Sequence, residues 1–161
     1  MKAVEIIEKK NNKEELTYKE IEYMVNSYVK GKINDNTMSD FVWSIYNNTL
    51  SMEETYYLTD IMIKSGETID LSSIDKPVCD KHSTGGVGDK ITLIVSPIVA
   101  ASGVAVPKMS GRGLGLTGGT VDKLESIPGY KLNVSKKEFL RLLNTVGCAV
   151  ISQSEKIAVA D

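Results

Sequence analysis

The sequence predicts an α/β protein, in which an N-terminal helical bundle is followed by the start of a parallel-sheet α/β domain with glycine-rich loops. Apolar residues recur at helical spacing up to about residue 67. From Pro77 onward, short β-type runs alternate with helix-length segments, and most of the 13 glycines lie after residue 84. We therefore place a helical domain at residues 1–67 and an incomplete α/β domain at residues 68–161.

The helical domain is predicted from apolar residues spaced i, i+3, i+4, i+7 and i+8. Two segments carry this spacing: Ile21, Met24, Val25, Tyr28 and Val29, and then Met38, Phe41, Val42, Ile45 and Tyr46. Thr17 with Glu20, and Ser51 with Glu54, form capping-box patterns at two helix starts. We expect the aromatic and methionine positions to lie in the core. Trp43 lies off the stripe, as a rim residue or a contact with a partner subunit.

The α/β domain is predicted from three short runs, at residues 78–80, 104–106 and 148–151. One crossover helix should extend from Asp89 to about Gly103, with a bend at Pro97. A second should start at a Ser135–Glu138 capping box and end at Gly147. Its predicted buried face consists of Phe139, Leu142, Leu143 and Val146.

Composition excludes several classes of protein. The 161 residues carry a net charge of −2 with both signs interspersed, which argues against a nucleic-acid-coating surface. No apolar run approaches the length of a membrane span, and we expect a soluble cytoplasmic protein without nucleic-acid or membrane partners. Cys79 and Cys148 are unclustered, which predicts buried free thiols rather than a disulfide or a zinc site.

Glycines concentrate where predicted strands end and helices begin, which is where α/β sheets bind ligands. The segment 81–89, KHSTGGVGD, follows the first predicted strand. Glycines allow backbone N–H groups to approach an anion, and a following helix N-terminus favours negative charge. Ser83 and Thr84 add hydroxyl donors and Lys81 adds a positive charge. The segment predicts a phosphate site, although it lacks the G-x-x-x-x-G-K-[ST] pattern of nucleotide P-loops.

A second cluster, 108–120 (KMSGRGLGLTGGT), follows the second predicted strand. Alone, its Gly113-Leu114-Gly115 is only a weak dinucleotide-type signal. Two such loops at neighbouring strand ends, however, can hold one anion from both sides. The predicted phosphate site comprises Lys81, Ser83, Thr92, Lys108, Met109, Ser110 and Thr120. Arg112, Asp122 and Glu125 are expected to brace the second loop by ion pairing.

Together, the segments 81–89 and 110–129 resemble the thymidine and pyrimidine-nucleoside phosphorylase family, and the similarity extends more weakly over the rest of the chain. The resemblance implies phosphate-dependent cleavage of uridine, thymidine or deoxyuridine to the free base and a pentose 1-phosphate. It also implies a homodimer, with inorganic phosphate and a pyrimidine nucleoside as substrates. By the same resemblance, the helical domain contributes to dimerisation and to the nucleoside site.

The family's phosphate contacts fall here on Lys81, Ser83, Thr92, Ser110 and Thr120. Lys81 and His82 are then the candidate catalytic residues, with His82 assisting departure of the base. No organic cofactor is implied. Some bacterial members hold a potassium ion through main-chain oxygens, which correspond here to Gly88 and Lys90.

Two departures from the family pattern limit these expectations. Leu116 occupies a position where the family usually has histidine, and the family's downstream residues that hold the pyrimidine ring do not occur in these 161 residues. We therefore expect a truncated chain that is inactive alone. Two alternatives stay open: a non-catalytic phosphate-binding and dimerisation fragment, and a related phosphoribosyltransferase that acts on a pyrophosphate-bearing substrate with magnesium.

Overall fold

The structure is a computed structural model that describes residues 2–83, 89–113, 117–154, 156–157 and 159–160. The chain divides into two compact units, residues 1–68 with 155–161 and residues 69–154. Each unit has its own apolar core. The two units are described separately.

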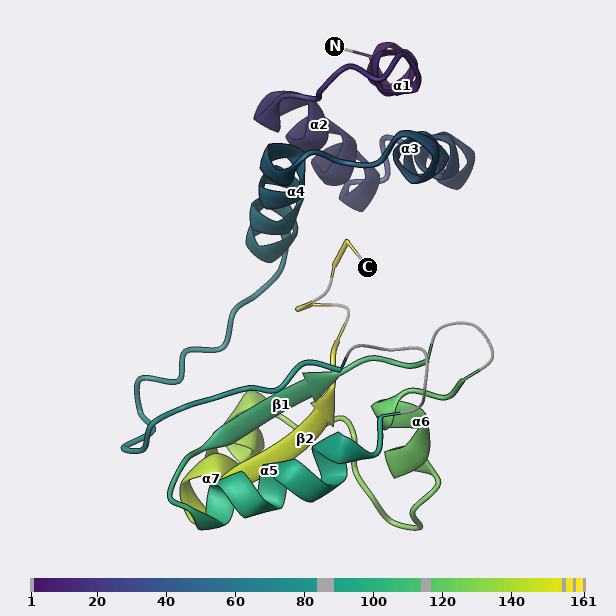
Figure 1. The fold of residues 1–161 in the computed structure, drawn as a ribbon. Coiled ribbons are helices and arrows are strands. Elements are labelled where there is room, and N and C mark those ends of the chain that lie inside the picture. The colour runs from purple at the N-terminus through teal and green to yellow at the C-terminus, as the bar shows by residue number, and fades with distance from the viewer. Residues whose placement is uncertain (1, 84–88, 114–116, 155, 158, 161) are drawn as a thin grey trace. The chain divides into compact units, whose positions relative to one another are not determined.

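The first unit is helical, with α1 (Ala3–Asn11), α2 (Tyr18–Val29), α3 (Asp35–Asn48) and α4 (Met52–Ser65) (Figure 1). Helix α1 packs against α3, and α2 packs against α4. Both predicted capping boxes, at Thr17 and Ser51, are present. The buried core residues are Ile6, Leu16, Ile21, Met24, Val25, Ile33, Phe41 and Ile61.

The expectation that the whole apolar stripe of α3 is buried is wrong. Phe41 is buried, but Val42 and Tyr46 of the stripe are 57% and 75% exposed, and Trp43, which lies off the stripe, is 64% exposed. The stripe is wider than the area that α1 and α2 cover, because helix spacing fixes which residues share a face but not how much of that face has a neighbour. An apolar surface therefore remains on α3.

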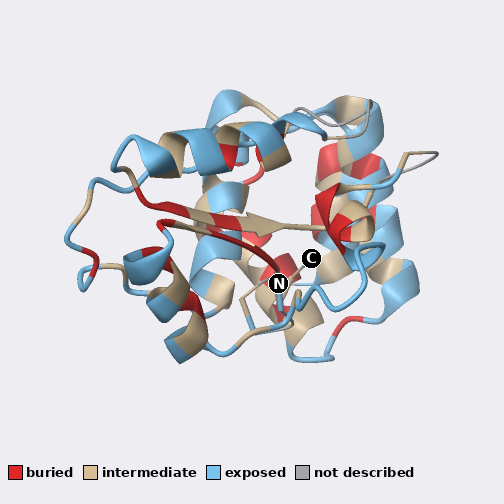
Figure 2. Ribbon diagram, turned by 90° about the horizontal axis from the view of Figure 1, so that it is seen from below, coloured by how far each residue is buried: buried red, intermediate tan, exposed pale blue. Residues whose placement is uncertain are grey.

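The second unit contains a parallel two-stranded sheet formed by β1 (Val106–Ser110) and β2 (Cys148–Ser152). Figure 2 shows buried residues along these strands. The helices of this unit are α5 (Ile91–Ala101), α6 (Thr120–Glu125) and α7 (Lys136–Thr145). The predicted fold class, a helical region followed by a parallel α/β arrangement, is confirmed.

The run at residues 78–80 does not form a full strand. It makes a single parallel bridge, Val78 to Ala105, and the following strand starts two residues later than the predicted run at 104–106. Pairing stops at Asp80, where a carboxylate oxygen accepts the Lys81 amide at 2.8 Å instead of leaving that donor to a strand. Cys79 is consequently exposed, so a buried thiol was the wrong expectation there. Cys148 is partly buried, and burial raises the pKa of its thiol.

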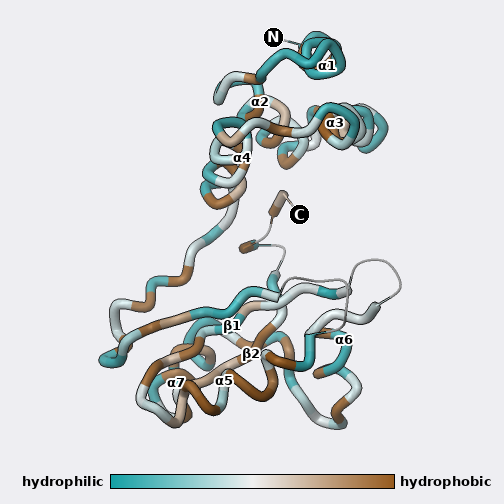
Figure 3. The backbone as a smooth tube through the Cα atoms, viewed as in Figure 1, coloured by the Kyte–Doolittle hydropathy of each residue, from teal (hydrophilic) through white to brown (hydrophobic). Residues whose placement is uncertain are grey.

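Helix α7 forms only half of its predicted capping box. The Ser135 hydroxyl accepts the Glu138 amide at 3.2 Å, but the Glu138 carboxylate pairs with Arg141. Phe139 and Leu143 are buried as expected, whereas Val146 at the helix end is 63% exposed. Helix α5 forms as expected with Pro97 inside it, and it is strongly apolar along its length (Figure 3). None of the helices in the described ranges has the length and apolar character that crossing a membrane requires.

Candidate functional site

The predicted phosphate-binding residues lie at one edge of the parallel sheet. Strands β1 and β2 run in the same direction with Ser110 opposite Ser152, so their carboxyl ends share an edge. The Val78–Ala105 bridge is also parallel, and the first glycine-rich segment therefore leaves from the same edge. Helix α5 begins and α6 lies at this end of the strands (Figure 1). The topology thus places both glycine-rich segments at the carboxyl ends of the strands.

Asp89, directly before α5, is the centre of the hydrogen bonds at this edge. Its carboxylate accepts the Lys81 ammonium at 2.8 Å and the Thr120 hydroxyl at 2.8 Å. It also accepts the Thr92 hydroxyl, and the Thr92 backbone amide at 3.1 Å. The Lys81 ammonium donates to the Thr92 hydroxyl at 3.0 Å as well. Three predicted phosphate-binding residues are therefore joined through one carboxylate.

The Asp89 carboxylate is ionised at neutral pH. Its side chain is only 5% exposed, and burial by itself would raise its pKa. Hydrogen bonds from Lys81, Thr92 and Thr120 outweigh that effect and hold the pKa well below its usual value. The Asp89 anion thus balances the charge of Lys81, whose side chain is 28% exposed.

Lys108 places a second ammonium at this edge, on β1. Its side chain is 7% exposed, and its ion-pair partner among the described residues is Asp80, with an oxygen 3.5 Å away. Charge-assisted N–H···O bonds are normally shorter, at about 2.7–2.9 Å, and an ammonium has three N–H donors. The Lys108 charge is therefore only weakly balanced by Asp80, which favours a further anion nearby.

The second glycine-rich loop is closed at its base by Asp122. One oxygen of its carboxylate accepts the backbone amides of Gly113 and Gly119, at 2.8 and 2.7 Å. These two bonds, followed by one from Arg112, lower the pKa of Asp122. Arg112 pairs with Asp122 and Glu125 at 2.9 and 2.7 Å, so the predicted bracing contacts are present.

Glycine is required where this loop closes. A Cβ on Gly119 would lie 2.6 Å from the Arg112 carbonyl carbon and 2.6 Å from the Gly113 nitrogen. A Cβ on Gly113 would overlap the Thr117 carbonyl oxygen. The two glycines therefore allow the backbone segments on either side of the loop to approach each other closely.

The remaining predicted site residues occupy different environments. His82 is exposed and Ser83 is partly buried, both directly after Lys81. Ser110 ends β1, where its carbonyl accepts the Gln153 amide at 3.2 Å. The Met109 side chain packs against the apolar core, which leaves its main chain as the part able to face an anion. Lys90 is exposed at the start of α5, and Gly88, the other predicted potassium position, lies outside the described residues.

Sequence reasoning did not assign a site role to Asp80 or Asp89. The available signal for Asp89 was its position at the end of the glycine-rich segment, directly before the next helix and three residues before Thr92. An aspartate there can accept the backbone amides that a helix start leaves unpaired. Its bond to Thr120 depends on the tertiary fold and has no local sequence signal.

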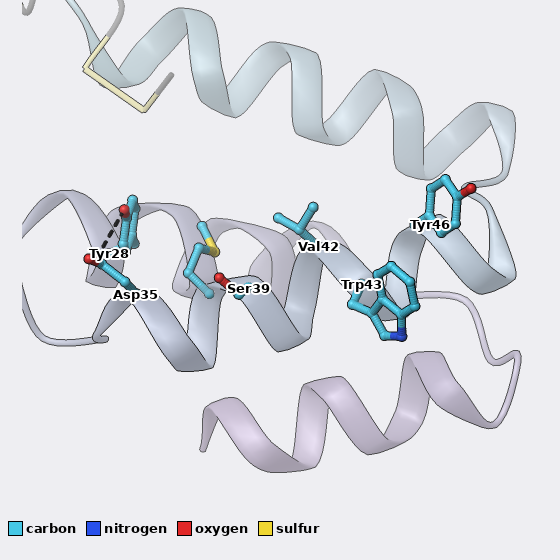
Figure 4. Close-up of a pocket in the computed structure, with 7 residues that line it drawn as sticks. Tyr28, Asp35, Ser39, Val42, Trp43 and Tyr46 are labelled. Atoms are coloured by element: carbon cyan, nitrogen blue, oxygen red, sulfur yellow. Dashed lines mark hydrogen bonds between the residues drawn. The ribbon is translucent and has the colours of Figure 1, made fainter. Parts of the chain in front are cut away.

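A separate apolar pocket lies on the helical unit (Figure 4). It has a volume of about 360 Å³ and is lined by Tyr28, Asp35, Met38, Ser39, Val42, Trp43 and Tyr46. The rings of Trp43 and Tyr46 stack with centroids 5.3 Å apart, and Tyr28 donates to Asp35 at 3.2 Å. Apart from Tyr28 on α2, the lining belongs to α3.

Side-chain metal ligands do not cluster in the part of the chain that the structure describes. No group of at least three histidine, cysteine, aspartate or glutamate side chains there has the arrangement of a metal site. The chemistry of the described edge is that of an anion site, with lysine ammonium groups, threonine hydroxyls and a helix start.

Comparison with protein families gives two matches. Residues 4–66 match the helical bundle domain of a glycosyl transferase family, and residues 75–161 match the a/b domain of that family. The chain is 50% identical to a pyrimidine-nucleoside phosphorylase of Staphylococcus epidermidis and 51% identical to one of Bacillus subtilis. Each match covers all of this chain but 37% of the relative, so the chain spans little more than a third of their length.

Among solved structures, the fold is similar to the crystal structure of anthranilate phosphoribosyltransferase (TrpD) from Thermus thermophilus. The TM-score is 0.74 with 16% sequence identity, and the match covers 96% of this chain and 47% of that one. At this identity the likeness concerns the fold alone.

Proposed function

Because the chain belongs to the glycosyl transferase family whose helical bundle and a/b domains it matches, we propose that it is the phosphate-binding part of a pyrimidine-nucleoside phosphorylase. The reaction would convert a pyrimidine nucleoside and inorganic phosphate into the free base and a pentose 1-phosphate. The observation that carries the proposal is the convergence of Lys81, Thr92 and Thr120 at the carboxyl edge of the sheet. Relatives of that name, about half identical over the whole chain, support it.

Phosphorolysis makes specific demands on this edge. A phosphate oxygen attacks the anomeric carbon of the sugar, the carbon–nitrogen bond to the base breaks, and the bonding electron pair leaves with the pyrimidine. The protein must hold phosphate against one face of that carbon and stabilise the charge on the departing base. Lys81, Lys108 and the hydroxyls of the predicted site, Ser83 and Ser110 included, would serve the first task.

His82 is the candidate for the second task. Its imidazole is exposed directly beside Lys81, so a bound nucleoside can reach it. Neutral imidazole donates a hydrogen bond from one ring nitrogen, and imidazolium can also supply a proton to the leaving base. Replacing His82 with alanine should therefore lower the turnover number more than the affinity for phosphate.

The proposal is tested on the chain itself and on a chimera. In the chimera, the chain replaces the matching 37% of the Bacillus subtilis relative. We expect the isolated chain to bind phosphate without releasing base, and the chimera to release uracil or thymine from nucleosides only when phosphate or arsenate is present. Release of base is followed by ultraviolet absorbance.

Four outcomes would contradict the proposal. If a folded chimera releases no base, the proposed phosphorylase activity is contradicted. If it releases base without phosphate, the activity is that of a hydrolase instead. Activity that needs magnesium and a pyrophosphate-bearing sugar would indicate a phosphoribosyltransferase. If the isolated chain binds no phosphate, its assigned part in the reaction is lost.

We also propose that the protein is a homodimer that uses the exposed face of α3. Val42, Trp43 and Tyr46 form a patch of large apolar side chains, and such patches are typical of protein interfaces. A second copy of the chain is the partner that the family resemblance implies. Trp43→Glu should shift the sedimentation coefficient from dimer to monomer, whereas Lys131→Glu, on an exposed loop of the other unit, should not.

Two further expectations stay predictions. A potassium ion held by the main-chain oxygens of Gly88 and Lys90 would be indicated by higher activity of the chimera in potassium than in sodium buffer. A cytoplasmic location would be tested by fractionating cells that produce the protein.

A further inference from the structure

We infer that Asp89 is a positioning residue, whose carboxylate holds Lys81, Thr92 and Thr120 in place for phosphate. The inference rests on the proposed function and adds to it a residue that need not touch phosphate. Each of the three side chains belongs to a different segment: Lys81 begins the first glycine-rich segment, Thr92 lies on α5 and Thr120 begins α6. Asp89 is a hydrogen-bond partner that all three share.

The burial of these groups makes the arrangement specific. Thr92 and Thr120 are 0% and 4% exposed, and the Asp89 side chain is 5% exposed. An ionised carboxylate in such surroundings is stable only when its oxygens are well hydrogen-bonded. Each Asp89 oxygen has at least two donors, since one accepts Lys81 and the Thr92 amide and the other accepts both threonine hydroxyls. Because each oxygen has two donors, it stays hydrogen-bonded when one of them turns away, and it becomes unpaired only when both are lost.

The number of hydrogen-bond donors on each side chain indicates which bonds phosphate would replace. A threonine hydroxyl has a single O–H donor, and those of Thr92 and Thr120 are both directed to Asp89. Lys81 uses one N–H bond for Asp89 and another for Thr92, and within the described part of the chain its third donor has no acceptor and can serve an anion. Phosphate would therefore meet Lys81 first. One threonine hydroxyl would then turn to phosphate without any movement of the backbone, while the other keeps the same Asp89 oxygen hydrogen-bonded.

A positioning role for Asp89 predicts a particular direction of change in phosphate affinity when its carboxylate is removed. Simple electrostatics predicts that removing a carboxylate beside an anion site strengthens anion binding, because the repulsion between like charges is lost. A positioning role predicts the opposite, since Lys81 and the threonines lose the group that orders them. A purely structural role would lower the stability of the protein and leave phosphate affinity unchanged.

The test is the affinity of the 161-residue chain for inorganic phosphate, measured by isothermal titration calorimetry. Asp89→Asn keeps one carbonyl oxygen for the Thr92 amide, and the start of α5 should therefore survive. We expect phosphate binding to weaken at least tenfold, by the cost of misplaced binding groups. Asp75→Asn removes one exposed carboxylate from the same unit and should leave the affinity unchanged.

Asp89→Glu serves as a second variant, in case Asp89→Asn does not fold. It retains the charge but displaces the carboxylate by one methylene, and it should also weaken phosphate binding. Equal or tighter binding by a folded Asp89 variant would overturn this inference while leaving the proposed function intact. If the unmodified chain binds no phosphate, the proposed function and this inference both fail, and the two failures are thus distinguishable.

Discussion

Glu54 in the helical unit and Asp89 in the α/β unit are both buried carboxylates paired with a lysine, yet they differ in what else they bind. The Glu54 carboxylate accepts the Lys10 ammonium at 2.8 Å and the backbone amides of Leu16 and Ser51, each at 2.8 Å. The Lys10 and Glu54 side chains are 4% and 1% exposed. Lys10, Leu16 and Glu54 are buried in the helical unit, and Ser51 is partly buried.

Asp89 has the same type of lysine partner and is also buried, but its network reaches solvent through that lysine. Its lysine, Lys81, is partly exposed, and its remaining partners include two hydroxyls that can rotate toward another acceptor. Backbone amides cannot rotate in this way without moving the chain. We therefore expect the Glu54 network to stabilise the helical unit, and the Asp89 network to exchange a hydroxyl donor with a ligand.

The strongest test of this contrast is Glu54→Ala. The substitution leaves the buried Lys10 ammonium and two backbone amides without their acceptor, and breaking such a buried pair costs about 3–5 kcal/mol. We expect the free energy of unfolding in urea to fall by that amount. Lys10→Met combined with Glu54→Met should recover much of the loss, because no buried charge then stays unpaired. A loss below about 1 kcal/mol, within the range of an exposed pair, would contradict the enclosed character of this network.

Lys81→Ala tests the Asp89 network through ligand binding instead. The third N–H donor and the positive charge of Lys81 are lost, and we expect phosphate affinity to fall about 100-fold, equivalent to ~2.7 kcal/mol. Lys131→Ala removes the same charge from an exposed position of the same unit and serves as the control. Calorimetric titration with phosphate measures both. Equal losses in the two variants would show that net charge, rather than the position of Lys81, controls binding.

In both networks, the sequence predicts the contacts that have a local pattern but not the contacts between distant residues. Glu54 was predicted from a local pattern, since the capping box needs only Ser51 three residues earlier. Its pairing with Lys10, 44 residues away, and that of Asp89 with Thr120, 31 residues away, depend on tertiary packing. Lys81, Thr92 and Thr120 were assigned to the site from residue type and from family resemblance, whereas the carboxylate between them was not. Similarly, the α3 stripe was predicted correctly as one face, but its exposure at Val42 and Tyr46 depends on how far the neighbouring helices extend.

A third test concerns the rigid base of the second loop. Gly119→Ala would place a Cβ against the backbone of Arg112 and Gly113, and such overpacking typically costs about 1–3 kcal/mol. We expect a lower free energy of unfolding together with weaker phosphate binding, since Thr120 follows directly. Gly118→Ala is the matched control, because its Cβ would meet only the Asp122 side chain at an ordinary 3.5 Å. If the two variants behave alike, the close approach of the backbone segments is not what shapes the loop.

The smallest expected effect is the response of the two carboxylates to acid. Burial alone would raise the pKa of Glu54, but bonds from Lys10 and from the Ser51 and Leu16 amides outweigh it and lower the pKa below its ordinary 4.5. A carboxyl group with a lowered folded-state pKa adds stability above its unfolded pKa, and this stability is lost as pH falls through the folded pKa. A pKa that is lower by one in the folded state corresponds to about 1.4 kcal/mol in the free energy of unfolding.

The pH dependence of unfolding can therefore separate the two networks. In Glu54→Gln, the free energy of unfolding should fall less steeply below pH 4.5 than in the unmodified chain. In Asp89→Asn, the flattening should begin lower, below 3.8, because that is the ordinary pKa of aspartate and the folded-state pKa is lower still. Urea unfolding at a series of pH values measures both slopes. An unchanged slope in either variant would mean that the replaced carboxyl group has the same pKa in the folded and in the unfolded protein.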